Sequence, residues 1–119
     1  MLCHGGSWQM KQTLVMQRTR IKICGLTRPI DVQTAVDSGV DALGFVFYEA
    51  STRCVTAQAV SGMTASLPPF VSKVGLFVNA AFETIVQTVN IAKLDLLQFH
   101  GDESPDFCES VARILARPY

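Results

Sequence analysis

Two patterns of apolar and polar positions follow one another along this chain, one typical of strands and one typical of helices. Short apolar runs predict strands at 20–24, 42–47, 73–78 and 95–100. Three of these runs carry β-branched or aromatic residues at both odd and even positions, which is typical of strands buried on both faces of a parallel sheet. Each run is followed by a segment whose apolar residues favour a helix. The pattern therefore predicts a strand and a helix, repeated four times.

The first two predicted helices have recognisable ends. The first begins near Pro29, a favoured first-turn residue, and stops at Gly39. The second has Thr56 as its N-cap and runs to Leu67, because the two prolines that follow cannot continue a helix. Its apolar stripe is weak, and Gly62 lowers its helix propensity.

The last two predicted helices have stronger apolar stripes. In the third, four apolar residues fall on one helical face: Phe82, Ile85, Val86 and Val89. The fourth has Ser104 as N-cap and Pro105 at its first position. Its apolar face includes Cys108 and continues to residue 115, four residues before the chain ends.

The repeat of strand and helix implies right-handed crossovers and a parallel sheet covered by helices. Two architectures fit, an open doubly wound sheet and a closed (β/α)8 barrel. The first strand–helix junction, "CGLTRP", lacks the G-x-G-x-x-G fingerprint, and no P-loop motif occurs, so the barrel is preferred. A barrel of this kind usually needs about 250 residues. We therefore expect an α/β fold whose parallel βαβ units form roughly the first half of a (β/α)8 TIM barrel.

Two regions follow from this pattern. Residues 20–119 form the expected partial barrel, with four βα units. Residues 1–19 show no apolar periodicity, and we expect a disordered N-terminal extension there, with translation starting naturally at Met1, Met10 or Met16.

Composition narrows the classes of partner. Of 119 residues, 49% are hydrophobic, and ten basic side chains balance ten acidic ones, so neither nucleic acid nor a membrane surface is an expected partner. No apolar run is long enough to cross a bilayer and no secretory signal is recognisable, which predicts a cytoplasmic protein. The four cysteines form no C-x-x-C pair and have no histidine at ligand spacing, so we expect neither a metal site nor disulfides.

Candidate chemistry lies where the predicted strands end, because the loops after parallel strands gather on one face of the sheet. That face collects Cys24, Arg53, Gln98 and His100. From the residues alone, Cys24 is either a core-filling thiol or a reactive one, and His100 is either a pocket residue or simply the end of a strand. Cys108 is expected in the core.

Four segments in order, "RIKICGLTR", "DALGFVFYEASTR", "PPFVSKVGLFVN" and "LLQFHGDE", strongly resemble the phosphoribosylanthranilate isomerase family of tryptophan biosynthesis. The resemblance begins near Arg20, which favours Met16 as the natural start. It implies a (β/α)8 barrel. It also implies an Amadori rearrangement of N-(5-phosphoribosyl)anthranilate, a small-molecule substrate, to 1-(2-carboxyphenylamino)-1-deoxyribulose 5-phosphate. This reaction needs neither cofactor nor metal.

The resemblance also assigns roles. The cysteine of the family's K-I-C-G motif is the general base, and it corresponds to Cys24. A thiol serves as a base near neutral pH only where cationic or dipolar neighbours favour the thiolate, and Lys22 is a candidate neighbour. Arg53 corresponds to the arginine that contacts the anthranilate carboxylate, for which a planar guanidinium is well suited. Gln98 and His100 correspond to polar residues of the substrate pocket.

The sequence departs from the family pattern in one large respect. The family's general acid, an aspartate on the sixth strand, and its phosphate-binding loops have no counterpart in these 119 residues. An alternative interpretation is therefore a non-catalytic half-barrel that self-associates or pairs with a complementary C-terminal half. Another phosphosugar barrel enzyme with a cysteine is a third interpretation, but it leaves the four motifs unexplained.

Overall fold

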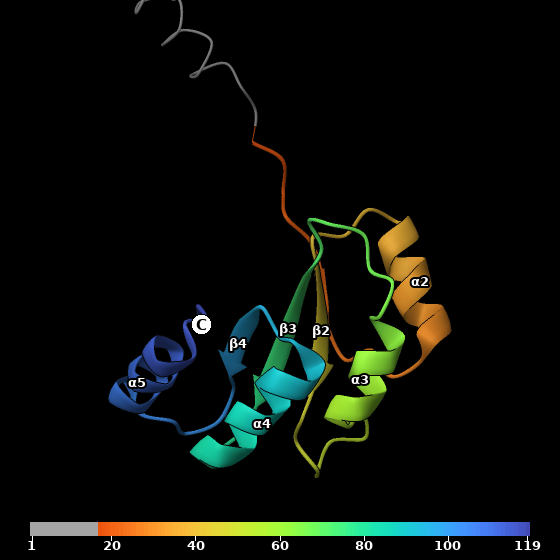
Figure 1. The fold of residues 1–119 in the computed structure, drawn as a ribbon. Coiled ribbons are helices and arrows are strands. Elements are labelled where there is room, and N and C mark those ends of the chain that lie inside the picture. Colours follow the sequence, from red (N-terminus) through yellow and green to blue (C-terminus); the bar gives the residue numbers. More distant parts are fainter. Residues whose placement is uncertain (1–16) are drawn as a thin grey trace, which may run out of the picture.

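The computed structural model describes residues 17–119; most of the expected extension, with its three candidate start positions, lies outside them. Four strands and four helices alternate along the described chain (Figure 1). They are β1 (Lys22–Ile23), α2 (Pro29–Asp37), β2 (Ala42–Val46), α3 (Ala57–Met63), β3 (Ser72–Phe77), α4 (Phe82–Ala92), β4 (Leu96–Phe99) and α5 (Pro105–Leu115). The four predicted βα units are confirmed.

The strands form one parallel sheet in the order β1-β2-β3-β4. A doubly wound sheet would show a reversal of strand order, and these four strands show none. Sequential order is what a barrel wall requires, because each crossover moves the chain one strand further in the same direction. The described sheet is therefore a segment of barrel wall with β1 and β4 at its two edges.

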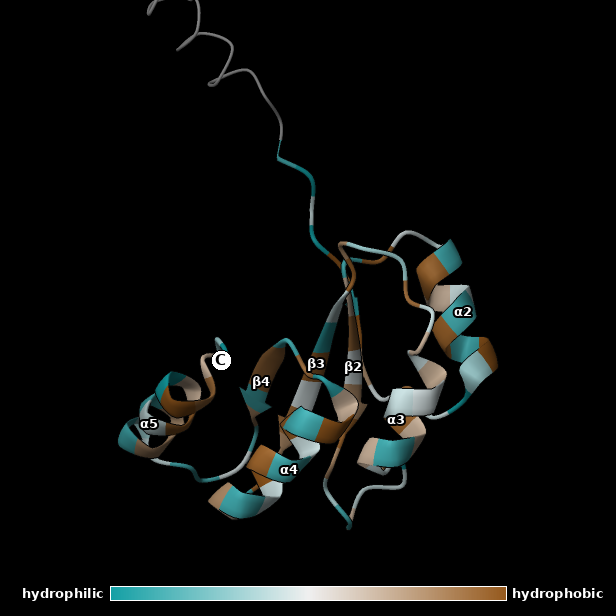
Figure 2. Cartoon of the chain, viewed as in Figure 1, coloured by the Kyte–Doolittle hydropathy of each residue, from teal (hydrophilic) through white to brown (hydrophobic). Residues whose placement is uncertain are grey.

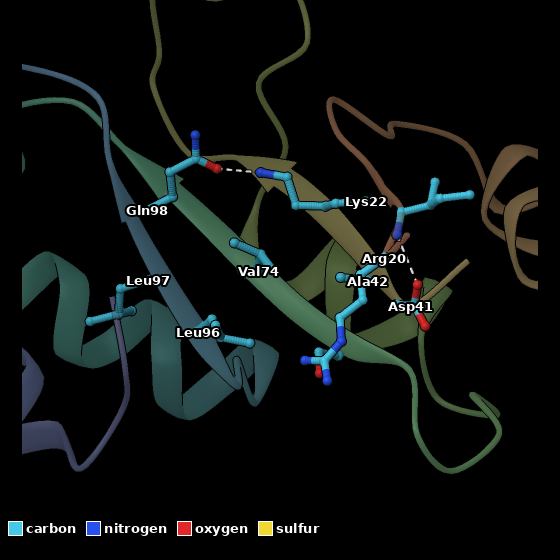
Figure 3. A pocket seen from close by; sticks show the side chains of 10 residues that line it. Arg20, Lys22, Asp41, Ala42, Val74, Leu96, Leu97 and Gln98 are labelled. Carbon is cyan, nitrogen blue, oxygen red and sulfur yellow. Dashed lines mark hydrogen bonds between the residues drawn. The ribbon is translucent and has the colours of Figure 1, made fainter. Parts of the chain in front are cut away.

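One face of this sheet packs against all four helices. Leu43 and Phe45 of β2, Phe77 of β3 and Leu97 of β4 are buried in a single core cluster. The helices contribute to the same cluster with Val32, Ala35, Val60, Ile85, Val89 and Val111. Figure 2 shows the helices banded in brown and teal, as expected of helices with one apolar side. The opposite sheet face carries the alternate strand residues, including Lys22, Ala42, Val74 and Gln98, around an open hollow (Figure 3).

Two elements are clearly shorter than predicted, whereas β2, β3 and β4 differ from their predicted ranges by a single residue at one or both ends. The strand expected over 20–24 is only two residues long, Lys22–Ile23, and both residues pair with β2. The helix expected to reach Leu67 ends at Met63. Thr64 leaves helical geometry there, at φ −111° and ψ 10°, and its hydroxyl donates to the Val60 carbonyl at 2.7 Å. The Thr56 and Ser104 N-caps are confirmed, accepting from the backbone amides of Ala59 and Phe107.

Aspartates join neighbouring strands at the amino-terminal edge of the sheet. Asp41, before β2, accepts a hydrogen bond from the Ile21 amide at 2.8 Å, and Asp95, before β4, accepts one from the Lys73 amide at 2.8 Å. Arg18 also forms an ion pair with Asp41 at 2.6 Å. The Arg18 guanidinium, followed by the Ile21 amide, lowers the pKa of Asp41 to about 2. These contacts fix the end of the sheet opposite the candidate site.

Candidate active site

Cys24 lies directly after β1, where the chain turns toward α2. The backbone amides of Gly25 and Leu26 both donate to the Gly44 carbonyl of β2, at 3.0 and 3.2 Å. These bonds hold the turn against the neighbouring strand, with Gly25 at a φ of 82° that suits glycine. The Cys24 side chain is half-buried. It therefore sits at the carboxyl end of the sheet, as predicted, although one residue beyond the strand rather than within it.

Arg53 reaches the same place from the loop between β2 and α3. Its backbone amide donates to the Ser51 hydroxyl at 3.1 Å, and the following residue, Cys54, bridges back to Val46. The Arg53 side chain extends over Gly25, where a Cβ atom would lie 2.4 Å from Nη1 and 2.8 Å from Cζ. The fold thus brings a guanidinium next to the residue that follows Cys24. These two predicted site residues, 29 positions apart in the sequence, are neighbours in space.

Gln98 and Lys22 meet across the open face of the sheet. The Lys22 ammonium donates to Gln98 Oε1 (Figure 3), although the two residues belong to the two edge strands, β1 and β4. Such a contact requires the sheet to curve, because two strands lie between them. Lys22 is the candidate cationic neighbour of Cys24, and the structure shows its ammonium hydrogen-bonded to Gln98.

His100 follows β4 at the same end of the sheet and is exposed. Its backbone amide donates to the Phe77 carbonyl at 2.9 Å, which continues the β3–β4 ladder. This backbone bond matches the expectation that a histidine here ends a strand. The structure places His100 at the carboxyl edge, and the role of its side chain in a pocket stays a prediction.

A pair of residues that the sequence did not single out for this role links two loops beside His100. The Glu103 carboxylate accepts from the Asn79 amide through Oε2 and from the Gly101 amide through Oε1, both at 2.8 Å. The Asn79 side chain in turn accepts from the Asp102 amide at 2.8 Å. Asn79 has a φ of 50°, a conformation that asparagine tolerates better than most residues. The sequence signal for these hydrogen bonds between the two loops was "HGDE" after β4 and "VN" after β3.

A hollow on the open face of the sheet does not coincide with most of these groups. It has a volume of about 400 Å³ and is lined by residues of all four strands and of the segments leading into them. Lys22 and Gln98 border it, whereas Cys24, Arg53 and His100 do not. The hollow is the open inner face of the barrel segment, and the candidate site lies beyond it, at the carboxyl edge.

The remaining groups offer little further chemistry. Cys108 is buried in α5, and burial raises the pKa of its thiol, which confirms its predicted place in the core. Within residues 17–119, no three histidine, cysteine or acidic side chains cluster as metal ligands do. No helix in that part of the chain is both long enough and apolar enough to span a membrane.

A parallel sheet in sequential order, covered by helices on one face and with polar groups beyond its carboxyl ends, defines part of a (β/α)-barrel protein. A family model described as N-(5'-phosphoribosyl)anthranilate (PRA) isomerase matches residues 21–116. The chain belongs to this family. The expected barrel architecture and the resemblance seen in the sequence are confirmed.

Curated relatives and solved structures agree with this assignment. The N-(5'-phosphoribosyl)anthranilate isomerase of Herminiimonas arsenicoxydans is 50% identical over 105 residues, covering 88% of this chain and 46% of the relative. The one from Pseudomonas fluorescens is 51% identical, covering 82% and 47%. The crystal structure of the Thermotoga maritima enzyme is 40% identical and superposes with a TM-score of 0.78, covering 81% of this chain and 47% of that one. This chain thus spans about half the length of the relatives it matches.

Proposed function

We propose that this chain supplies the base-bearing half of a phosphoribosylanthranilate isomerase, with Cys24 as general base and Arg53 as the ligand of the anthranilate carboxylate. The observation that carries the proposal is that the Arg53 side chain lies over Gly25, the residue that follows Cys24, within a barrel segment of the matching family. A solved family member holds reduced 1-(o-carboxyphenylamino)-1-deoxyribulose 5-phosphate, and 39% of its aligned residues are identical to those of this chain.

The chemistry divides between the two halves of the barrel. Opening the ribose ring requires an acid that protonates the furanose oxygen, which leaves a Schiff base. The Cys24 thiolate then removes the proton from C2′ to give the enolamine, which tautomerises to the ketone. Arg53 would orient the substrate through two parallel hydrogen bonds to the carboxylate. Gln98 and His100 would provide polar groups around the sugar, and the site would lie in the cytoplasm, where biosynthetic enzymes of this kind act.

The acid and the phosphate-binding loops belong, in this family, to the half of the barrel that the chain does not span. General acid–base catalysis contributes about 10²- to 10⁴-fold to a rate. We therefore expect the 119-residue chain by itself to turn over substrate at a small fraction of the rate reached when a complementary half is supplied.

A complementation assay tests this proposal. The C-terminal half of the Herminiimonas arsenicoxydans relative would be co-expressed with this chain, and consumption of the substrate followed by its anthranilate fluorescence. We expect turnover by the pair, little by either half, and a loss of about 10²-fold or more for Cys24→Ala. Cys54→Ala is the matched control, since Cys54 lies outside the proposed chemistry. Equal activity of the Cys24→Ala and wild-type pairs would refute the role of Cys24.

The second candidate function is the non-catalytic half-barrel, favoured by apolar residues at an open sheet edge. Ile21, just before β1, is 48% exposed, and Ile23, within β1, is 40% exposed. Val74 and Leu96 border the open hollow. Uncovered edges and apolar faces favour association. Light scattering after gel filtration separates the cases: a stable dimer that stays inactive with any complementary half supports the second function, whereas a shift to a one-to-one complex with that half supports the first.

A further inference from the structure

Gly44 occupies the one position of β2 that faces the turn after β1. In the register, Lys22 and Ile23 lie opposite Ala42 and Leu43, so Cys24 comes next to Gly44. A Cβ atom on residue 44 would lie 2.9 Å from the Cys24 sulfur, 3.0 Å from its Cα and 3.1 Å from its Cβ. The thiol therefore fills the space that any side chain at position 44 would take.

Backbone conformation does not account for this glycine. Among the described glycines, Gly25 and Gly39 have positive φ values, and Gly44 does not. A glycine inside a strand weakens it, since it has no side chain to pack and loses more entropy on folding. Gly44 is also buried, between Leu43 and Phe45, where a larger apolar residue would ordinarily add to the sheet. Space for Cys24 is the remaining reason for a glycine at this position.

The contacts of Gly44 also determine which atoms would yield to a larger side chain. Its carbonyl accepts the amides of Gly25 and Leu26, which holds the backbone of the turn in place. The Cys24 sulfur can move by rotation about a single bond, whereas Cys24 Cα cannot move without breaking that turn. A methyl group at position 44 would therefore displace the thiol first.

We propose that Gly44 is a positioning residue for Cys24: it keeps the thiol flat against β2, at the carboxyl edge next to Arg53. This inference rests on the proposed role of Cys24 as the base. A displacement of about 1 Å in a reacting group costs on the order of 10²-fold in rate. Gly44→Ala should consequently lower kcat of the complemented enzyme by about that factor, with little change in KM.

A thiol-reactivity experiment tests the placement without any need for activity. The rate of Cys24 alkylation by iodoacetamide is measured against pH by peptide mapping, in the wild-type 119-residue chain and in Gly44→Ala. We expect the Cys24 rate to change by about threefold or more, while that of Cys54, the internal reference, stays the same. Gly62→Ala is the matched control, because no atom lies within 4 Å of a Cβ at that exposed position. An unchanged pH–rate profile for Cys24 in Gly44→Ala would overturn the proposal.

A double-mutant cycle separates displacement of the thiol from a general loss of stability. Gly44→Ala should lower Tm in the wild-type chain and by a smaller amount in Cys24→Ala, where the sulfur, the nearest of the three Cys24 atoms, is gone. Equal losses in both backgrounds overturn the proposal. If Gly44→Ala does not fold, recovery of folding in the double variant Cys24→Ala/Gly44→Ala supports the proposal. Failure of the single and the double variant to fold overturns it. An active Cys24→Ala pair would refute the proposed base while leaving the alkylation and Tm results to decide the placement.

Discussion

The guanidinium of Arg53 lies directly over the α carbon of Gly25, at the place where any other residue would carry its side chain. Gly25 therefore meets two requirements, a φ of 82° and a free space above its backbone. The first can be met by other residues at a cost in strain, but the second can be met by glycine alone. This relationship fixes a cation beside the residue that follows Cys24.

Gly25→Ala should impair substrate binding by displacing Arg53. The left-handed conformation costs about 1–2 kcal/mol for alanine at either of two positions, Gly25 and Gly39, whose φ values are the same. At Gly39 no atom lies within 4 Å of the added Cβ, so Gly39→Ala carries the strain without the collision. We expect KM of the complemented enzyme to rise about tenfold or more in Gly25→Ala and to stay near wild type in Gly39→Ala. Equal KM values for the two variants would contradict the idea that Gly25 makes room for Arg53.

Asp41 should make stability depend on pH in the acid range. Its pKa lies at about 2, below the ordinary 3.8, so the ionised form is favoured by folding. The resulting stabilisation is complete above the ordinary value and is lost as pH falls through about 2. Asp41→Asn should therefore unfold at lower urea than wild type at pH 7, and the gap should narrow between pH 4 and pH 2. A constant gap between Asp41→Asn and wild type across this range would count against the Arg18 contact.

Removing the Glu103 carboxylate should loosen two loops together. Hydrogen bonds to a charged acceptor contribute about 1.5–3 kcal/mol each, less where water reaches them, and Glu103 makes two. In Glu103→Ala we expect the amides of Asn79 and Gly101 to exchange with deuterium about tenfold faster or more, and the free energy of unfolding to fall by about 1–3 kcal/mol. Glu109→Ala, on the exposed face of α5, is the control. Faster exchange at one of the two amides alone would show that the loops are not coupled through this carboxylate.

Cys108 should be the slowest of the described thiols to react. Burial in α5 raises the pKa of its thiol and restricts access to it, whereas Cys24 and Cys54 are half-buried. Limited alkylation near pH 7.5 followed by peptide mapping should label Cys108 last, with the differences disappearing in denaturant. Rapid labelling of Cys108 in the folded chain would contradict its place in the core.

Much of the architecture was predictable because it depends on local patterns. Ser104 and Pro105 placed the start of α5 at the residue observed, and the four βα units followed from alternating periods. The shortness of β1 and the early end of α3 were not predictable in this way. The first depends on where the chain leaves the neighbouring strand β2, and the second on the backbone of Thr64, which departs from helical geometry four residues before the two prolines.

The sequence by itself determined the family, the strand–helix repeat and the identity of the reactive candidates, since motifs and periodicity are properties of the chain order. Only the tertiary structure decided how these residues meet. The Arg53 side chain lies over Gly25, and the Cys24 side chain occupies the place of a Cβ atom on residue 44. Both contacts arise because adjacent parallel strands bring loops that are distant in the sequence to one edge of the sheet. Glycines are conspicuous in a sequence, but which side chain fills the space of a missing Cβ depends on the packing of another strand.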